Sequence, residues 1–333
     1  MNPKNAKRSI EHLTTRKVPV FLWGPPGIGK SSIVAQIAKE REIEFIDLRL
    51  SLLDPTDLRG IPFFNSEDNS AVWAPASFLP DESQKEGILF LDELNTAAPM
   101  VQASAYQLIL DRKIGEYTLP KGWSIVAAGN RESDRGVVFR MASPLANRFV
   151  HLDMEVSVSD WSEWAKKSAI DTSIIAFISY RPDALFAFNT KDDSKAFATP
   201  RTWQYVNEII TSTPEEDLLL PMISGAIGEE LAASFLGFKS VARSLPDIDK
   251  ILSGEIKDVP EETSALHILC TALAMRINED SRAADLDHLI RYTLNLPGEF
   301  AVMIIQDLRQ RHIELDYVKS WPLWMRQFNS LLH

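Results

Sequence analysis

The sequence predicts an α/β fold in which a parallel sheet is flanked by helices, followed by an all-helical region. From residue 1 to about residue 154, short apolar runs alternate with helical patterns. Strands that alternate with helices form parallel sheets with both faces covered. After about Glu155 the strand signals fade and helical patterns continue. The hydrophobic content of 45% is sufficient for a packed core in the α/β part and another in the helical part.

Five apolar runs are the predicted strands of the sheet. Each is four to eight residues of apolar or alternating character beside a turn or helix signal. The runs are VPVFLW at 18–23, IEFIDLRL at 43–50, GILFLDEL at 87–94, WSIVAAGN at 123–130 and RFVHLDME at 148–155. Helical patterns at 31–42 and 98–113 lie between them.

Two segments interrupt this alternation. Residues 51–83 are rich in proline and polar residues and contain Phe63, Phe64 and Trp73. Long irregular segments in compact domains are often functional, although these aromatic side chains could equally pack onto the domain as part of a surface loop. Residues 111–123 contain Gly115-Glu116 between two apolar positions, which predicts a small hairpin.

The length of 333 residues predicts one large or two ordinary domains. We expect an α/β core over 1–154, a helical lid domain over 155–240 and a helical C-terminal extension over 241–333. Near the end, Trp321 and Trp324 lie in an aromatic run that we expect to pack into the core of the extension.

Composition narrows the functional class. The net charge of −11 argues against a broad nucleic-acid surface. The single cysteine, Cys270, lies in an apolar run, so it is expected to be buried and no disulfide framework is possible. No signal peptide and no apolar stretch of about 18 residues is found, so we expect a cytoplasmic protein with no membrane partner.

A loop rich in glycine and proline follows the first predicted strand. It reads GPPGIGKS, which is Gly, four residues, then Gly-Lys-Ser. Glycines let backbone N–H groups cradle phosphate oxygens, and the following helix adds its positive end. Lys30 can reach the β- and γ-phosphates, and the Ser31 hydroxyl can bind Mg²⁺. The predicted nucleotide-binding residues are Gly24, Pro25, Pro26, Gly27, Ile28, Gly29, Lys30, Ser31 and Ser32.

An acidic pair ends the third predicted strand. Asp92 is expected to bind Mg²⁺, and Glu93 to polarise the water that attacks ATP. Such a pair could instead be a solvated strand end or a helix cap. The four apolar residues before it favour the metal-binding interpretation.

The motifs GPPGIGKS, LFLDELN, IVAAGN and SPLANRF occur in the order and spacing of AAA+ ATPases, and the chain resembles this family over residues 5–215. It looks most like the MoxR branch, which carries an insert within its second helix and a hairpin before the sensor 1 strand. Residues 54–80 and 111–120 occupy those places. MoxR proteins commonly have Asn-Pro after that strand, whereas this chain has Asn130-Arg131.

The resemblance implies roles for three further residues. Asn130 looks like sensor 1, whose amide orients the attacking water. Arg148 looks like the arginine finger that reaches the nucleotide of a neighbouring subunit, with Arg140 as a competing candidate. Arg201, at the start of a helix, resembles sensor 2, and whether it acts within its own subunit or across the boundary is open.

The resulting prediction is a MoxR-like, Mg²⁺-dependent AAA+ ATPase that assembles into a ring, usually a hexamer in this family, and remodels or activates protein partners. The resemblance implies a partner with a von Willebrand factor A domain. The alternative is a nucleic-acid-associated AAA+ motor, because helicases and clamp loaders share these motifs. A GTPase is disfavoured by the lack of an Asn-Lys-x-Asp motif.

Overall fold

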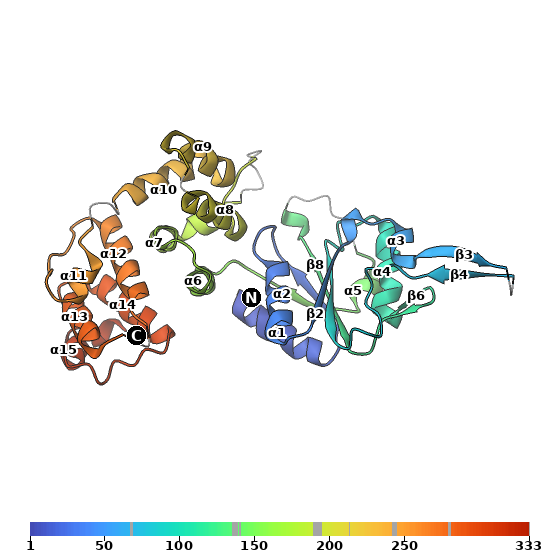
Figure 1. The fold of residues 1–333 in the computed structure, drawn as a ribbon, viewed down its shortest axis with the longest axis horizontal. Helices are drawn as coiled ribbons and strands as arrows, with labels where there is room; N and C mark the ends of the chain where they lie inside the picture. Colours follow the sequence, from blue (N-terminus) through green and yellow to red (C-terminus); the bar gives the residue numbers. More distant parts are fainter. Residues whose placement is uncertain are drawn as a thin grey trace. The chain divides into compact units, whose positions relative to one another are not determined.

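The chain forms two compact units in the computed structural model (Figure 1), which describes residues 1–66, 69–134, 139, 141–188, 195–212, 214–241, 245–278 and 281–332. One unit comprises Met1–Asp160, and the other comprises Trp161–Phe188 with the described residues after position 194. The first contains the parallel sheet and the second is helical, as the sequence predicts. The further division of the helical region at residue 240 stays a prediction.

The central sheet has five parallel strands in the order β2-β5-β8-β1-β9. Each predicted run contains one of them. They are β1 (Val20–Trp23), β2 (Glu44–Arg49), β5 (Gly87–Asp92), β8 (Trp123–Gly129) and β9 (Val150–Asp153). Strand β8 lies between β1 and β5, so the loops that follow these three strands leave the same edge of the sheet side by side.

Alternate residues of each strand pack against different helices. Val20 and Leu22 belong to a core with helices α1 (Pro3–Thr15) and α2 (Lys30–Glu40). Phe21, between them, belongs to a second core with α3 (Pro55–Arg59), α4 (Pro99–Asp111) and α5 (Ser143–Ala146). This period of two follows from the pleat of the strand, and it explains why strands buried on both faces are apolar throughout.

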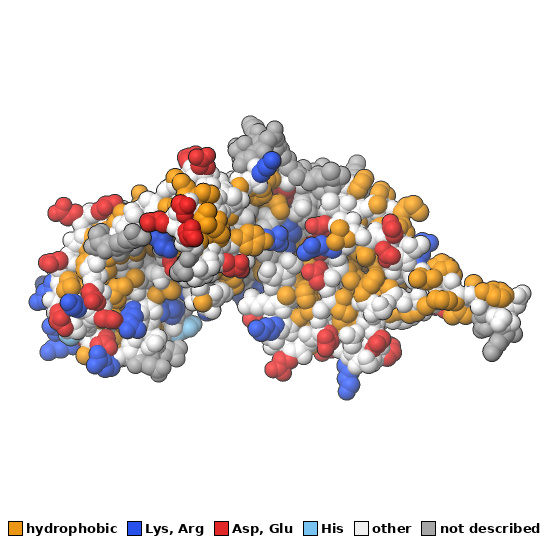
Figure 2. Space-filling view, turned by 45° about the horizontal axis from the view of Figure 1, so that its top comes forward, with side chains coloured by type: hydrophobic (Ala, Val, Ile, Leu, Met, Phe, Trp, Pro, Cys, Tyr) orange, Lys and Arg blue, Asp and Glu red, His pale blue; other side chains and the backbone are white. Residues whose placement is uncertain are grey.

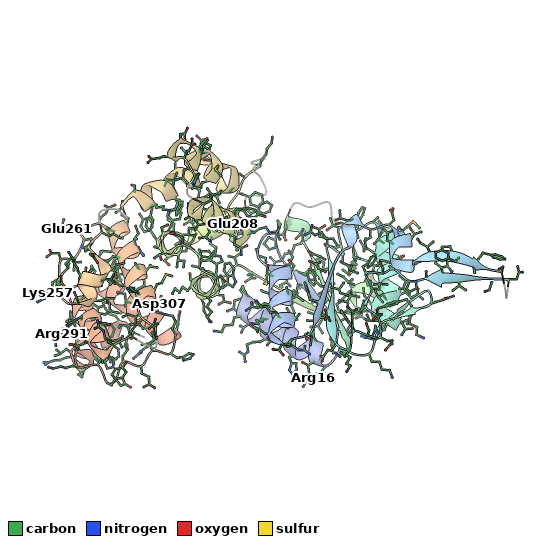
Figure 3. All side chains as sticks on the ribbon, in the orientation of Figure 1. Arg16, Glu208, Lys257, Glu261, Arg291 and Asp307 are labelled. Atoms are coloured by element: carbon green, nitrogen blue, oxygen red, sulfur yellow. The ribbon has the colours of Figure 1, made fainter. Side chains whose placement is uncertain are left out.

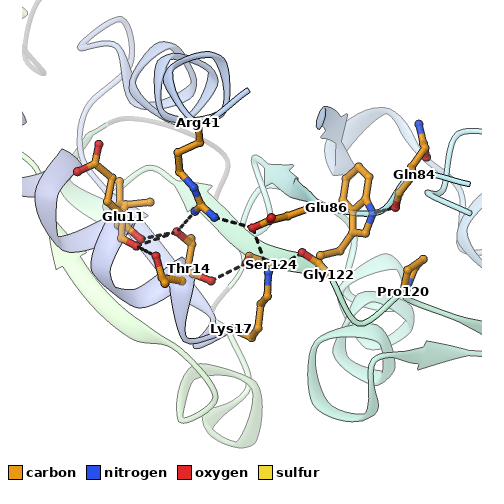
Figure 4. A network of polar contacts seen from close by, with 12 residues as sticks. Glu11, Thr14, Lys17, Arg41, Gln84, Glu86, Pro120, Gly122 and Ser124 are labelled. Carbon is orange, nitrogen blue, oxygen red and sulfur yellow. Dashed lines mark hydrogen bonds and ion pairs between the residues drawn. The ribbon is translucent and has the colours of Figure 1, made fainter. Parts of the chain in front are cut away.

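Polar contacts tie together the amino-terminal edge of the sheet (Figure 4). Glu86, directly before β5, accepts a hydrogen bond of 2.6 Å from Arg41. The Lys17 ammonium donates to the Gly122 carbonyl at 2.5 Å, and burial is the main cause that lowers the pKa of Lys17. Ser124 donates to the Thr14 carbonyl at 2.8 Å. These side chains stabilise the contacts between elements at the amino-terminal edge of the sheet. The predicted site residues of the loops after β1, β5 and β8 lie at the carboxyl-terminal edge.

The segment after β2 is more regular than the sequence indicates. It forms the 3₁₀ turn η1 (Leu50–Leu52), the short helix α3 and an antiparallel hairpin of β3 (Ile61–Asn65) and β4 (Ser70–Ala74) that projects from the unit (Figure 1). Phe63 and Phe64 are 57% and 71% exposed, so they do not pack onto the domain. Figure 2 shows hydrophobic side chains along this projection.

The predicted small hairpin before β8 is confirmed. Strands β6 (Lys113–Ile114) and β7 (Tyr117–Thr118) pair with Ile114 opposite Tyr117, and Gly115 has a φ of 56° in the turn. Ile114 is fully buried, and the Tyr117 hydroxyl donates to the Pro80 carbonyl at 2.7 Å. A 3₁₀ turn, η2 (Glu132–Asp134), follows β8.

The second unit is built from helices and 3₁₀ turns. Two of its helices are separated at Gly228, whose φ of 92° is incompatible with a right-handed helix. The elements are α6 (Val158–Lys167), whose first residues belong to the first unit, α7 (Thr172–Tyr180), η3 (Pro182–Leu185), α8 (Pro200–Thr211), α9 (Glu216–Ile227), α10 (Glu229–Val241), α11 (Ile248–Leu252), α12 (Thr263–Arg276), α13 (Ala283–Thr293), α14 (Gly298–Gln310), α15 (Trp321–Phe328) and η5 (Asn329–Leu331).

The C-terminal helices share one apolar core. Trp321 and Trp324 are 6% and 0% exposed and stack with ring centroids 5.1 Å apart, which confirms their predicted role in packing. Cys270 is also buried, and burial raises the pKa of its thiol to about 12. Asp307 (Figure 3) on α14 is paired with Lys166 and with Arg311. These contacts connect α6 to the C-terminal helices within the unit.

None of the helices among the described residues combines the length and the apolar character needed to cross a membrane.

Candidate functional site

The phosphate-binding loop predicted from the sequence connects β1 to α2 at the carboxyl-terminal edge of the sheet. Gly27 and Gly29 have φ values of 76° and 93°, a region that residues with a Cβ rarely adopt. Gly29 is the N-cap of α2 and provides no side-chain hydrogen bond. The first backbone N–H groups of a helix lack partners within the helix, so this helix start is suited to an anion. Ser31 and Ser32 lie in its first turn.

Lys30 connects this loop to the strand next to it. Its ammonium donates to the carbonyl oxygens of Gly24 at 2.6 Å and of Pro25 at 3.0 Å. It also donates to the Asn130 side-chain oxygen at 2.9 Å, across 100 residues of sequence. The predicted phosphate-binding lysine and the predicted sensor 1 therefore meet directly.

The acidic pair lies one strand further along the same edge. Asp92 is the last residue of β5, and its side chain accepts a hydrogen bond of 2.9 Å from the Glu93 backbone N–H. Glu93 has a φ of 57°, an uncommon conformation for a residue other than glycine. Its carbonyl accepts from the backbone of Thr96 and Ala97 at 3.0 and 3.1 Å, which holds this conformation. Backbone strain of this kind clusters at functional sites.

The electrostatics of Asp92 suit a bound cation. Burial is the main cause that raises the pKa of Asp92, and the charge of Glu93 raises it further. The hydrogen bond from the Glu93 backbone N–H, and then the charges of Lys30 and Arg49, act in the opposite direction without cancelling the burial. A dication would compensate this buried charge, and the Asp92 carboxylate and Ser31 hydroxyl are the hard oxygen donors that Mg²⁺ prefers.

Few side chains of the described residues are placed to bind that cation. Among the described residues, no three His, Cys, Asp or Glu side chains come close enough together to hold a metal ion. Mg²⁺ commonly uses one or two protein ligands and completes its shell with water and phosphate oxygens. The donor set fits such a site.

Ser51 is a site residue that the sequence analysis missed. It lies in η1, after β2, and its hydroxyl donates a hydrogen bond to the Glu93 carboxylate. In this conformation the Glu93 carboxylate, which is predicted to polarise water, accepts a hydrogen bond from Ser51 instead. A lone serine in a polar segment carries no signal of this contact, because the contact depends on β2 and β5 being neighbours in the sheet.

Arg148 lies at the other edge of the sheet. It is exposed in the turn between α5 and β9, two residues before Val150, which pairs with Val20 at the start of β1. The phosphate-binding loop begins after Trp23, at the far end of the same pair of strands. Four paired residues span about 10 Å, so Arg148 is remote from the loop of its own subunit. Arg140 lies outside the described residues.

Arg201 belongs to the helical unit. It is exposed in the first turn of α8, which starts at Pro200 as the sequence indicates. Thr199 caps this helix, and its hydroxyl accepts from the Thr202 backbone N–H at 3.1 Å. The role of Arg201 as sensor 2 stays a prediction.

Comparison with known families decides the nature of the first unit. Residues 20–152 match the family described as "ATPase family associated with various cellular activities (AAA)". Residues 20–152 form an AAA ATPase domain. The match spans all five strands of the sheet, from β1 to β9, and it confirms the predicted enzyme class and nucleotide binding.

Solved structures of other proteins resemble the chain only remotely. A RuvB mutant from Thermotoga maritima shares 22% identity over 75% of each chain, with a TM-score of 0.43. NtrX from Brucella abortus shares 15% identity over 98% of this chain and 67% of its own, with a TM-score of 0.43. Likenesses this remote carry no functional argument.

Proposed function

We propose that the chain is a MoxR-like AAA+ ATPase that hydrolyses ATP in a ring assembly and remodels or activates protein partners. The observation that carries the proposal is the contact between Lys30 and Asn130, at 2.9 Å, beside the acidic end of β5. It joins the ends of β1 and β8, and β8 pairs with β5, which ends at Asp92. The hairpins β3–β4 and β6–β7, at the positions expected for the MoxR branch, support that assignment.

In this proposal, the loop 24–29 and the start of α2 bind the phosphates of ATP. Lys30 now donates to two loop carbonyls and to Asn130, and phosphate oxygens would replace some of these acceptors. Ser31 and Asp92 would hold Mg²⁺, which supplies positive charge to the phosphates during transfer. Glu93 accepts the proton of the attacking water once its contact with Ser51 opens.

The exposed Arg148 completes the site of a neighbouring subunit. Its distance from its own phosphate-binding loop argues for this arrangement. A guanidinium supplied across a subunit boundary stabilises charge in the transition state. Hydrolysis would then require assembly, for which we propose the hexameric ring usual in this family.

The exposed hairpin β3–β4 is the proposed contact with the protein partner. Phe63 and Phe64 present apolar surface that the rest of the domain does not cover. A partner with a von Willebrand factor A domain and a cytoplasmic location belong to the same proposal, on the basis of the MoxR resemblance.

Two substitutions test the ATPase site. We expect Lys30→Ala to lose nucleotide binding, because the phosphates lose their main cationic partner. We expect Glu93→Gln to bind ATP but to turn over at least about 100-fold more slowly, as for loss of a general base. Nucleotide affinity and steady-state hydrolysis measure both. Hydrolysis by Glu93→Gln at the wild-type rate would reject Glu93 as the base.

The partner class is tested by affinity capture. Glu93→Gln with ATP should retain a protein client that mass spectrometry identifies, and the double variant Lys30→Ala/Glu93→Gln should retain none, because it does not bind ATP. Recovery of nucleic acid in place of protein, together with DNA-stimulated hydrolysis, would favour the alternative of a nucleic-acid motor.

A further inference from the structure

Asn95 is a buried polar residue next to the candidate site, two positions after Glu93, and it is 3% exposed. Its side-chain amide donates a hydrogen bond of 2.7 Å to the backbone carbonyl of Asn130. Only the NH₂ group can donate to a carbonyl oxygen, so the contact fixes the orientation of the amide. Burial of a polar side chain is costly unless it makes such a contact.

Neighbouring contacts show that this hydrogen bond continues the pairing of two strands. Strands β5 and β8 pair as far as Leu91 and Ala127. Beyond this last pair, the Leu94 N–H donates to the Ala128 carbonyl at 3.0 Å, and then Asn95 donates to Asn130. The loop after β5 is thereby held against the loop after β8.

Gly129 accommodates the side chain of Asn95. A Cβ at Gly129 would stand 2.1 Å from the Asn95 side-chain oxygen and 2.8 Å from its Cγ. Real Cβ atoms do not make such contacts, so any other residue at position 129 would displace the amide. A glycine that the strand itself does not need is explained by this close approach.

Asn95 also contacts the segment that leads towards Arg148. Its backbone carbonyl accepts a hydrogen bond of 2.7 Å from the Phe139 N–H. One residue thus holds the backbone of Asn130 with its side chain and the segment at Phe139 with its main chain. Asn130, in turn, accepts from Lys30.

We propose that Asn95 is a positioning residue for ATP hydrolysis, which fixes the backbone of Asn130 so that the Asn130 amide is aligned with the γ-phosphate and the attacking water. The inference rests on the proposed role of Asn130. It adds that this role depends on a second, buried amide supplied by the loop after β5, which also carries Glu93.

The first test removes the donor. Asn95→Ala is expected to lower kcat by about 10- to 100-fold, because small misplacements of catalytic groups have effects of this size. Affinity for ATP is expected to change less than about threefold, since the loop 24–29 and Lys30 are intact. Wild-type kcat in a folded Asn95→Ala variant would overturn the inference.

The second test uses the pH profile of Asn95→Asp, which keeps the shape of the side chain. A carboxylate cannot donate to the Asn130 carbonyl, whereas a protonated carboxyl can. Burial at this position, with Asp92 and Glu93 close in sequence, favours the protonated form at reduced pH. We expect the kcat of Asn95→Asp, relative to wild type, to rise at least about threefold from pH 8 to pH 6. A flat ratio, equal to that of Asn95→Ala, would contradict the hydrogen-bonding role.

Two control variants separate the possible failures. Thr96→Val removes a neighbouring buried hydroxyl that has no partner among the described residues, so kcat should stay within about twofold of wild type. Asn130→Ala should be as slow as Asn95→Ala. If Asn130→Ala has the wild-type kcat, the proposed role of Asn130 itself fails. If Asn130→Ala loses kcat but Asn95→Ala does not, the proposed role of Asn95 fails.

A variant that does not fold is recognised by its circular dichroism. Gly129→Ala then approaches the same contact from the opposite side, because its methyl group displaces the Asn95 amide. The same loss of kcat with retained ATP affinity is expected. Wild-type kcat in Gly129→Ala would overturn the proposal.

Discussion

At the scale of single residues, the candidate site contains groups that lower the stability of the folded state. Asp92 is a part-buried carboxylate whose pKa is raised, mainly by burial. The folded state therefore holds its proton more tightly than the unfolded state does. The free energy of unfolding falls as pH rises from the ordinary value of 3.8 through the raised pKa, and the penalty is complete above it. Glu93 adds a left-handed backbone to the same strand end.

Replacement of Asp92 should release this penalty. We expect the free energy of unfolding of Asp92→Asn at pH 7 without nucleotide to exceed that of wild type, so that the variant melts at a higher temperature. We also expect it to lose Mg²⁺-dependent hydrolysis. The asparagine oxygen still accepts the Glu93 N–H. The stabilisation should disappear well below pH 3.8, where the wild-type carboxyl is protonated in both states. Thermal unfolding across pH measures it, and equal melting temperatures at pH 7 would contradict it.

At the scale of elements, the hairpin β3–β4 exposes apolar side chains that packing within the described AAA domain does not explain. Its five-residue strands pair Phe63 with Val72 and Phe64 with Ala71. Ile61, Phe63, Phe64 and Val72 are all more than 40% exposed. Exposed apolar strands invite association, so proteins usually cover or shorten them. The exposed apolar surface of the hairpin therefore favours a role in contacting a partner.

Polar replacements in the hairpin should separate contact from catalysis. We expect Phe63→Ser/Phe64→Ser to keep basal ATP hydrolysis within about twofold and to keep the melting temperature, because exposed side chains contribute little to folding. Capture of the protein client should be lost. Met100→Ser, at a residue that is 71% exposed on α4, is the matched control and should retain capture. Retained capture by the double variant would place the partner contact elsewhere.

At the scale of the whole molecule, the proposed role of Arg148 would leave the site of a single subunit incomplete. The strand register places it at the edge of the sheet opposite the phosphate-binding loop. Assembly therefore decides whether the proposed site is complete.

Mixing two inactive variants tests this. We expect Arg148→Ala and Lys30→Ala each to be inactive alone. An equal mixture should recover about a quarter of wild-type activity, because random assembly pairs an intact loop with an intact arginine at about one site in four. A mixture of Lys30→Ala with Glu93→Gln should stay inactive, since both defects lie in the same site. No recovery in the first mixture would exclude a shared site built on Arg148.

Features that depend on neighbours along the chain could be predicted from the sequence. Strand periodicity, the glycine pattern of the loop and the turn at Gly115 are local, so the five strands, the start of α2 and the hairpin β6–β7 were predictable. The position of β8 between β1 and β5, which brings Lys30 to Asn130, is visible only in the folded chain. The contacts of Ser51 and Asn95, the exposure of Phe63 and the edge on which Arg148 lies follow from that arrangement. Parallel pairing joins residues far apart in sequence, and no local pattern records which strands become neighbours.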